Sequence, residues 1–345
     1  MNLKEQLFAL SAAAGPSGKE DEAARLGAAF LSPLVDRLDC DPLGNIMGWR
    51  FSDRENARTL LIDAHLDEVS LIVTGQDEGY LRFIPCNGAV DPRILPGLRV
   101  RILAETPIEG IITCLPPHVL SAEERERPFS VDILRIDTGL TPEEAEKLAP
   151  IGTRIVYGTK PFSMGEHRVC GKSLDNRACF AMLLRTAELL AGQDLPVNVC
   201  FTGSVQEESG LTGIKTAAYT AAPDFALVTD ATFGSTPDSP KADTFPLNCG
   251  PVIGIGPILH RRLTEQLMVC ARRLQIPFER EFSARNTGTN AMQTQISRMG
   301  VPTMQISVPL RYMHTPLEVI DLRDLEQSAR LIAEFVLSAG EGAML

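Results

Sequence analysis

Apolar runs of strand length alternate with helix-like patterns along most of the chain. Residues 59–65 (TLLIDAH) are almost continuously apolar, which is typical of a strand buried on both faces. After residue 160, strands and helices alternate to the end of the chain. The predicted elements there are helix 176–191, strand 197–205, helix 212–222, strand 225–231, helix 264–274, strand 302–308 and helix 322–338. This alternation predicts an α/β fold with a mixed, largely parallel sheet flanked by helices.

A block with a different pattern follows the first buried strand. Within residues 69–160, short apolar runs are separated by Gly, Pro and acidic residues at spacings of roughly 8 to 12 residues, as in a small barrel or sandwich. We therefore expect a small β-barrel domain, residues 69–160, inserted into an α/β domain. The two parts of that catalytic domain would be residues 1–68 and 161–345.

Two capping-box patterns mark helix starts. Ser17 and Glu20 predict a helix near the N-terminus. Thr141 and Glu144, with Pro142 at the first helical position, predict one helix within the β-rich block.

Composition and charge narrow the class of protein. A chain of 345 residues exceeds the usual size of one hydrophobic core, so two structural domains are expected. The net charge of −11 argues against nucleic acid or a membrane surface as a partner, because both bind Lys- and Arg-rich surfaces. Glu5 interrupts the first apolar stretch, unlike a secretory signal. The eight cysteines are scattered without a CxxC pair, so we expect reduced thiols in a cytoplasmic protein.

Histidines and carboxylates occur where predicted strands end. The candidates are His65, Glu207, Glu208, Asp230 and His314. Taken singly, each has an ordinary explanation as a turn, cap or surface residue. In open α/β sheets, however, ligands collect at the carboxyl ends of the strands. One edge carrying two imidazoles and several carboxylates would repel itself unless cations lie among them, so the conjunction favours a metal site.

Asp175 lies where a helix is predicted to begin, so it is either an N-cap or a further ligand. The two oxygens of a carboxylate can bridge two cations. Imidazole nitrogens combined with carboxylate oxygens suit zinc, cobalt or manganese better than calcium, which prefers oxygen ligands alone.

Five ordered motifs resemble those of the tetrahedral aminopeptidases, a family with glutamyl, leucyl, lysyl and deblocking members, some of which carry endoglucanase names. The motifs are 65–68 (HLDE), 172–177 (KSLDNR), 206–213 (QEESGLTG), 228–232 (VTDAT) and 309–315 (PLRYMHT). The likeness extends over nearly the whole chain. It implies an aminopeptidase that uses two divalent ions per subunit, zinc foremost and cobalt or manganese as alternatives, to remove N-terminal residues from peptides with a free N-terminus.

The resemblance also implies roles for single residues. The implied metal ligands are His65, Asp175, Glu208, Asp230 and His314, with Asp175 as the bridge. Glu207 would be the general base that takes a proton from a metal-activated water and passes it to the leaving amine. Asp67 would orient His65 from behind. Related enzymes have a cis peptide bond after the bridging Asp, so we expect one between Asp175 and Asn176.

Two residues depart from the family pattern. Asn290 stands where many relatives have Asp, and Ser70 stands where Gly is common. Neither is an implied ligand. The family also assembles tetrahedral particles, which implies a homo-oligomer, a dodecamer built from dimers with its sites facing a chamber; a plain dimer is the alternative.

Three other functions compete with this hypothesis. A glycosidase needs carboxylates about 5 to 9.5 Å apart across a bond, whereas adjacent Glu207 and Glu208 would point to opposite faces of a strand. It would also leave His65 and His314 without a task. A metal-dependent deacylase or carboxypeptidase is a closer alternative, but those relatives usually carry an α/β dimerisation domain. A non-catalytic scaffold protein would be expected to lack a ligand or the base, and none is missing.

Overall fold

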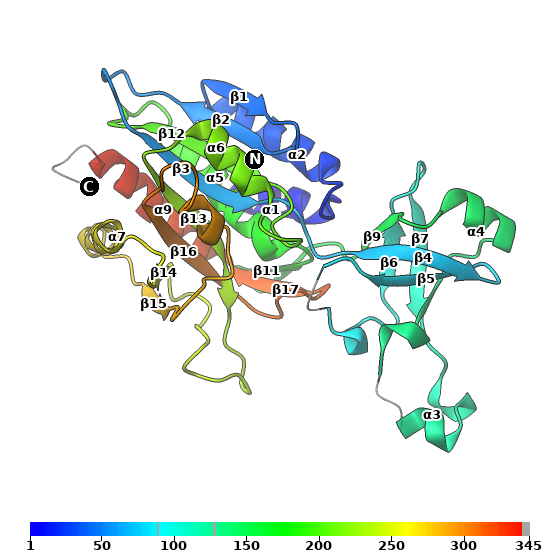
Figure 1. The fold of residues 1–345 in the computed structure, drawn as a ribbon. Coiled ribbons are helices and arrows are strands. Elements are labelled where there is room, and N and C mark those ends of the chain that lie inside the picture. The colour runs from blue at the N-terminus through cyan, green and yellow to red at the C-terminus, as the bar shows by residue number, and fades with distance from the viewer. Residues whose placement is uncertain (88–89, 127–128, 340–345) are drawn as a thin grey trace.

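The computed structural model describes residues 1–87, 90–126 and 129–339. An eight-stranded sheet with helices on both faces forms the main body, and a closed barrel of six strands stands beside it (Figure 1). The predicted fold class, a mixed sheet flanked by helices together with a small barrel, is therefore confirmed.

The main sheet is mixed, with a parallel centre. Its strands, in spatial order, are β1 Arg37–Cys40, β2 Ile46–Arg50, β12 Asn198–Ser204, β3 Thr59–His65, β13 Phe225–Phe233, β16 Thr303–Leu310, β14 Val252–Ile255 and β15 Glu279–Phe282. Strands β12, β3, β13 and β16 run parallel to one another, whereas β2 and β14 join this group in antiparallel pairing. The four central strands consequently end at the same edge of the sheet.

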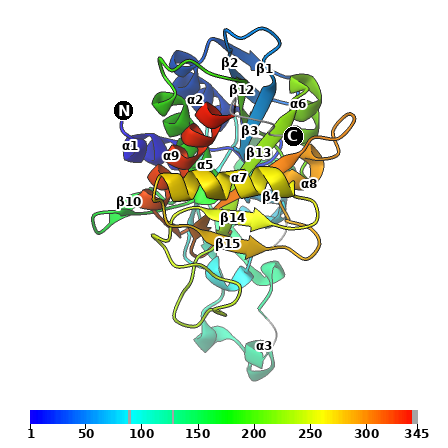
Figure 2. The ribbon, with the colours of Figure 1, turned by 90° about the vertical axis from the view of Figure 1, so that its left-hand side faces the viewer.

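Helices cover both faces of this sheet because its central strands are apolar on both sides. The helices are α1 Leu3–Ala12, α2 Asp21–Leu31, α5 Leu174–Leu189, α6 Gly213–Ala221, α7 Arg261–Arg273, α8 Ala291–Thr294 and α9 Leu322–Ser338. Leu60 and Ile62 of β3 share a core with residues of α5 and α9, while Leu61 packs with residues of α6. Helix α7 contacts β14 and α9 (Figure 2).

The barrel has a hydrophobic core of its own. Its strands are β4 Leu71–Asp77, β5 Tyr80–Pro85, β6 Arg99–Ile102, β7 Ile108–Thr113, β8 Arg135–Asp137 and β9 Arg154–Tyr157. Two helices, α3 Ala122–Glu126 and α4 Pro142–Leu148, belong to the same segment. Leu71, Val100, Ile112 and Ile155 are fully buried inside it. All barrel strands fall within 69–160, the range that we propose as the inserted domain.

A short antiparallel sheet joins the end of the barrel segment to the C-terminal part. It consists of β10 Phe162–Met164, β11 Arg168–Gly171 and β17 Glu318–Asp321. Single 3-10 turns occupy Ser32–Leu34, Pro92–Ile94, Pro117–Val119 and Val131–Ile133. Among the helices of the described ranges, none has the length and apolar character needed to cross a membrane.

The two capping boxes had different outcomes. Thr141 and Glu144 form the predicted reciprocal cap at the start of α4. The prediction for Ser17 was wrong, because α2 begins after Glu20 and Ser17 Oγ instead donates to Asp67 Oδ2 at 2.6 Å. Asp67 is fully buried, and a hydrogen bond to a buried carboxylate is stronger than one between neutral groups.

Candidate active site

The carboxyl ends of the central strands, the loops that follow them and the start of α5 bring all the predicted ligands and the predicted base into one cluster. Its members are His65, Asp175, Glu207, Glu208, Asp230 and His314, and they line a pocket of about 540 Å³. His65 is the last residue of β3, as predicted. Asp230 does not follow its strand, however, because β13 continues to Phe233. His118, His167 and His260 do not line the pocket.

Asp175 lies between the two histidines of the cluster. Its Oδ1 is 3.3 Å from His65 Nε2, and its Oδ2 is 3.4 Å from His314 Nε2. Asp230 Oδ1 is 3.8 Å from His65 Nε2, and Glu208 Oε1 is 3.4 Å from His314 Nε2. Asp175 therefore has one carboxylate oxygen near each histidine.

These separations fit cations better than direct hydrogen bonds. Ligand atoms about 2.0 to 2.1 Å from a tetrahedral ion are roughly 3.3 Å apart. Asp175 Oδ1 and Glu208 Oε1 are buried without a hydrogen-bond partner, a costly state unless a cation compensates for it. Mutual distances form two groups of potential ligands: His65 with Glu207 and Asp230, and His65 with Asp175 and Glu208. Distance alone therefore does not separate the base from the ligands or assign each ligand to one ion.

The ionisation of the chain by itself shows the same need for cations. Burial raises the pKa of Glu207 to about 9, and Asp230 and Glu208 add to the rise. Burial also raises the pKa of Asp230 well above its usual range. Although burial alone would lower the pKa of His314, Asp175 and Glu208 raise it to about 11. Divalent cations would instead keep the carboxylates ionised and the imidazoles neutral.

Asp67 connects the two halves of the cluster. Its Oδ1 is 3.3 Å from His65 Nδ1, so the other ring nitrogen of His65 faces the cluster. The same carboxylate accepts hydrogen bonds from the backbone N–H of Glu207 at 2.9 Å and of Glu208 at 3.1 Å. One buried carboxylate thus orients an imidazole and fixes the turn that carries both glutamates.

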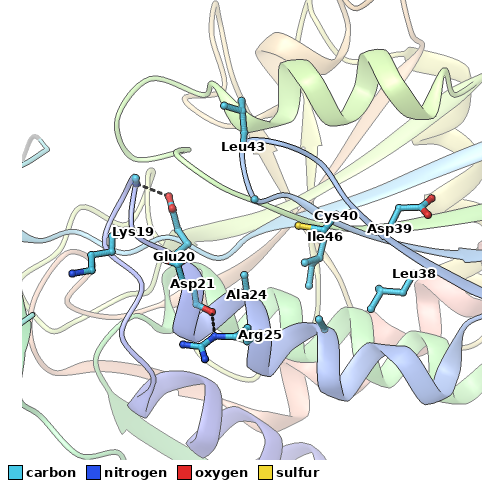
Figure 3. A pocket seen from close by; sticks show the side chains of 13 residues that line it. Lys19, Glu20, Asp21, Ala24, Arg25, Leu38, Asp39, Cys40, Leu43 and Ile46 are labelled. Carbon is cyan, nitrogen blue, oxygen red and sulfur yellow. Dashed lines mark hydrogen bonds between the residues drawn. The ribbon is translucent and has the colours of Figure 1, made fainter. Parts of the chain in front are cut away.

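Another pocket lies behind this turn, between α2 and the β1–β2 hairpin (Figure 3). Its volume is about 370 Å³, and Glu20 and Arg25 are among the charged residues that line it. Glu20 Oε1 accepts hydrogen bonds from the backbone N–H of Gly18 and of Gln206. Burial raises the pKa of Glu20 to about 7. The carboxylate of Glu20 therefore supports the segment that precedes Glu207.

Comparison with known protein families identifies the family of this chain. The profile of the M42 glutamyl aminopeptidases matches residues 44–331. This chain belongs to the M42 glutamyl aminopeptidase family. The lysyl aminopeptidase of Pyrococcus furiosus is 32% identical over 307 residues, which cover 88% of this chain and 87% of that protein. The M42 chain is a peptide hydrolase, and the predicted resemblance to the tetrahedral aminopeptidases is confirmed.

Solved structures of aminopeptidases share the fold of the M42 chain over almost its whole length. Aminopeptidase APDkam598 of the archaeon Desulfurococcus kamchatkensis has a TM-score of 0.89 at 32% identity, covering 99% of this chain and 98% of that one. The TET1 peptidase of Pyrococcus horikoshii, which can assemble into a tetrahedron or a large octahedral shell, has a TM-score of 0.84 at 28% identity, with coverages of 97% and 99%.

Sequence reasoning did not identify Glu318 in the M42 site. Its side chain is buried and accepts hydrogen bonds from the backbone N–H of His314 at 2.8 Å and of Asp175 at 3.1 Å. The pairing of β11 with β17 places Glu318 opposite Gly171, just before the segment that carries Asp175. An acidic residue among the apolar neighbours of β17 was the available signal, and it points to a buried carboxylate that needs donors.

A buried ion-pair network lies behind the M42 cluster and was also not predicted. Glu68 accepts from Lys172 Nζ at 2.7 Å and from Arg177 at 3.2 Å. Burial lowers the pKa of Lys172 to about 8 although the Glu68 charge opposes the shift. Removing one partner of such a network leaves an uncompensated buried charge, which costs about 3 to 5 kcal/mol. The network ties the residues around Asp175 to the segment after His65.

The structure explains one departure from the family pattern. Asn290 Nδ2 donates to Asp63 Oδ2 at 2.8 Å and to Ser204 Oγ at 2.9 Å. An Asp at position 290 would place two carboxylates in contact, so the amide is the residue that suits Asp63. Ser70 is buried, and its backbone N–H donates to Asn87 Oδ1. The Asp175–Asn176 peptide bond is cis, as predicted.

Proposed function

We propose that this M42 peptidase removes N-terminal residues from peptides with two divalent metal ions, zinc foremost and cobalt or manganese as alternatives. The proposed ligands are His65, Asp175, Glu208, Asp230 and His314. The observation that carries the proposal is the position of Asp175, whose two oxygens face different histidines. A bridging carboxylate between two ligand sets is the arrangement that a two-metal hydrolase requires.

Two divalent ions at this site would polarise the scissile carbonyl and lower the pKa of a nearby water. Glu207 is the proposed general base. Its Oε2 is 3.8 Å from His65 Nε2, so it borders the cluster, and Glu208 faces the other histidine. With the ions bound, Glu207 would be ionised, so it could take a proton from the water and pass it to the leaving amine. Asp67 contacts both the Glu207 backbone N–H and the His65 ring, and so holds the two in a fixed position relative to each other.

The competing functions use this geometry less well. A glycosidase would leave both histidines of the cluster without a role. A deacylase or carboxypeptidase could use the same ligands, but the barrel and the M42 relatives favour an aminopeptidase.

Peptides with free and acetylated N-termini test the proposed activity. We expect stepwise release of N-terminal residues from the free peptides, detected by mass spectrometry. The acetylated copies should react at least about 30-fold more slowly, because losing a charge-assisted contact in a buried site costs about 2 kcal/mol or more. Release of C-terminal residues, or equal cleavage of both sets, would contradict the proposal.

We further propose that the barrel mediates assembly of a dodecamer built from dimers, with the sites facing a chamber. No described residue within 69–160 lines the pocket, yet this segment exposes large apolar side chains. These are Ile84, Ile111, Leu115, Val119 and Ile133, each about half exposed or more. Closed symmetry is the norm for soluble homo-oligomers, and the TET1 peptidase of Pyrococcus horikoshii assembles into closed shells. A chamber would admit short peptides and exclude folded proteins.

Light scattering on the metal-loaded protein tests the assembly. We expect a particle close to twelve times the 37.5 kDa of one chain. Leu115→Asp should reduce the mass, because it places a charge among the exposed apolar side chains, whereas Leu115→Met should not. A dimeric wild-type mass would refute the dodecamer, and a fully active monomer would refute assembly altogether.

A further inference from the structure

The active-site pocket extends beyond the metal cluster, and this further part is lined by an additional acidic residue, Glu281. Besides the cluster, its lining includes Thr232 and Phe233 of β13, Glu281 of β15, and Thr289 and Gln305. Among the described residues that line it, there is no Lys or Arg. Glu281 is therefore a carboxylate inside the substrate pocket that is not one of the proposed ligands or the base.

Neutral hydroxyl groups hold the Glu281 carboxylate in place. Oε1 accepts a hydrogen bond from Thr232 Oγ1 at 2.6 Å, and Oε2 accepts one from Ser307 Oγ at 3.3 Å. Thr232 is two residues after Asp230 on β13, so both side chains lie on the same face of that strand. Ser307 of β16 is the register partner of Asp230. The strands that carry the cluster thus also fix Glu281 beside it.

No Lys or Arg among the described residues that line the pocket compensates the charge of Glu281. Two divalent ions would be held by Asp175, Glu208 and Asp230 together with the two histidines, and Glu281 is not among these proposed ligands. The hydroxyls of Thr232 and Ser307 orient Glu281 but carry no charge. A partly buried carboxylate with fixed geometry and an open pocket in front of it favours a cationic ligand.

We propose that Glu281 recognises the side chain of the substrate's N-terminal residue and makes the enzyme selective for N-terminal Lys and Arg. This inference rests on the proposed aminopeptidase function. Leu211, Phe233 and Met313 also line the pocket, and they offer apolar surface to the methylene stem of such a side chain. N-terminal Asp or Glu would meet a like charge and is disfavoured. The names of relatives do not decide this specificity, because the family is named glutamyl and the Pyrococcus furiosus relative lysyl.

A purely structural role for Glu281 is the alternative. On that view the carboxylate ties β15 to β13 and β16, and its loss would affect all substrates to the same extent. The two roles can be separated with a pair of substrates that differ in the terminal charge alone. Lysyl and norleucyl nitroanilides form such a pair, because norleucine has the lysine stem without the ammonium group.

We expect the wild-type enzyme to have a higher kcat/KM for the lysyl than for the norleucyl substrate. Glu281→Gln keeps the size of the side chain and an oxygen for Thr232. It should lower the lysyl-to-norleucyl ratio about 10- to 100-fold, as expected when one partner of a partly desolvated charge pair is removed. Norleucyl hydrolysis should stay within about 3-fold of wild type. Glu279→Gln is the matched control, since Glu279 is an exposed residue of the same strand and should leave the ratio unchanged.

Two results would overturn the assignment: a wild-type enzyme without preference for lysyl over norleucyl, or an equal loss of both activities in Glu281→Gln. If that variant does not fold, the wild-type protein supplies the test. Added salt should then lower kcat/KM for the lysyl substrate and not for the norleucyl one, and an equal response of both overturns the inference. Absence of hydrolysis with every aminoacyl substrate would overturn the proposed function itself, whereas hydrolysis without charge selectivity overturns the specificity alone.

Discussion

Glu207→Gln is expected to lower kcat by about 10²- to 10⁴-fold, the usual contribution of a general base, while the protein keeps its metal. The glutamine retains the shape of the side chain, so the turn that Asp67 holds through the Glu207 N–H should persist. The amide, however, cannot accept the proton. Steady-state kinetics on an aminoacyl nitroanilide, with metal content measured by elemental analysis on the same preparation, gives both quantities.

Glu208→Gln is the matched comparison, because it changes the neighbouring residue in the same way. Glu208 Oε1 faces His314 and is buried without a hydrogen-bond partner, so its neutral amide should weaken metal binding. We expect lower metal content in this variant, and partial recovery of activity with excess metal. If the two variants contain equal amounts of metal, the proposed division between base and ligand is wrong.

Removal of metal is expected to abolish peptidase activity completely. Dialysis against a chelator should give an inactive protein, and zinc, cobalt or manganese should restore turnover. The proposed reaction needs the ions to polarise the scissile carbonyl and to lower the pKa of the water. Without them, burial favours the protonated forms of Glu207 and Asp230. Nitroanilide hydrolysis before and after each metal is added back measures the effect.

Calcium is the control in this experiment, because a site with two imidazoles does not suit a cation that prefers oxygen ligands. The thermal unfolding midpoint should rise with the restoring metals, because ligands that bind only the folded state stabilise it. Full activity in a sample shown by elemental analysis to be metal-free would refute the two-metal proposal.

The sequence predicted the site best where its residues lie at or near the ends of buried strands. The apolar runs of β3, β12, β13 and β16 are long and covered on both faces, so their pattern is unambiguous and the residues at their ends could be grouped. The final helix was predicted with its observed limits, Leu322–Ser338, because a strongly amphipathic helix has a clear period.

Short strands and contacts between distant segments could not be predicted from the hydrophobic pattern. Strands β1, β14 and β15 have four residues each, too few to show a period, and they were not predicted. The roles of Glu318 and Glu281 depend on which strands pair, and pairing between distant segments cannot be read from local pattern. Ser17 was misassigned for the same reason, since its partner Asp67 is far away in the sequence.

The contact between Asp63 and Asn290 also limits how such a sequence can change over time. The amide of Asn290 donates to the buried carboxyl group of Asp63. Converting Asn290 alone to Asp creates two adjacent buried acids, and converting Asp63 alone to Asn removes the acceptor that the amide uses. Each single substitution is therefore expected to destabilise the protein, whereas exchanging the two residues together would restore a donor and an acceptor. We therefore expect the residues at positions 63 and 290 to change together in evolution rather than one at a time.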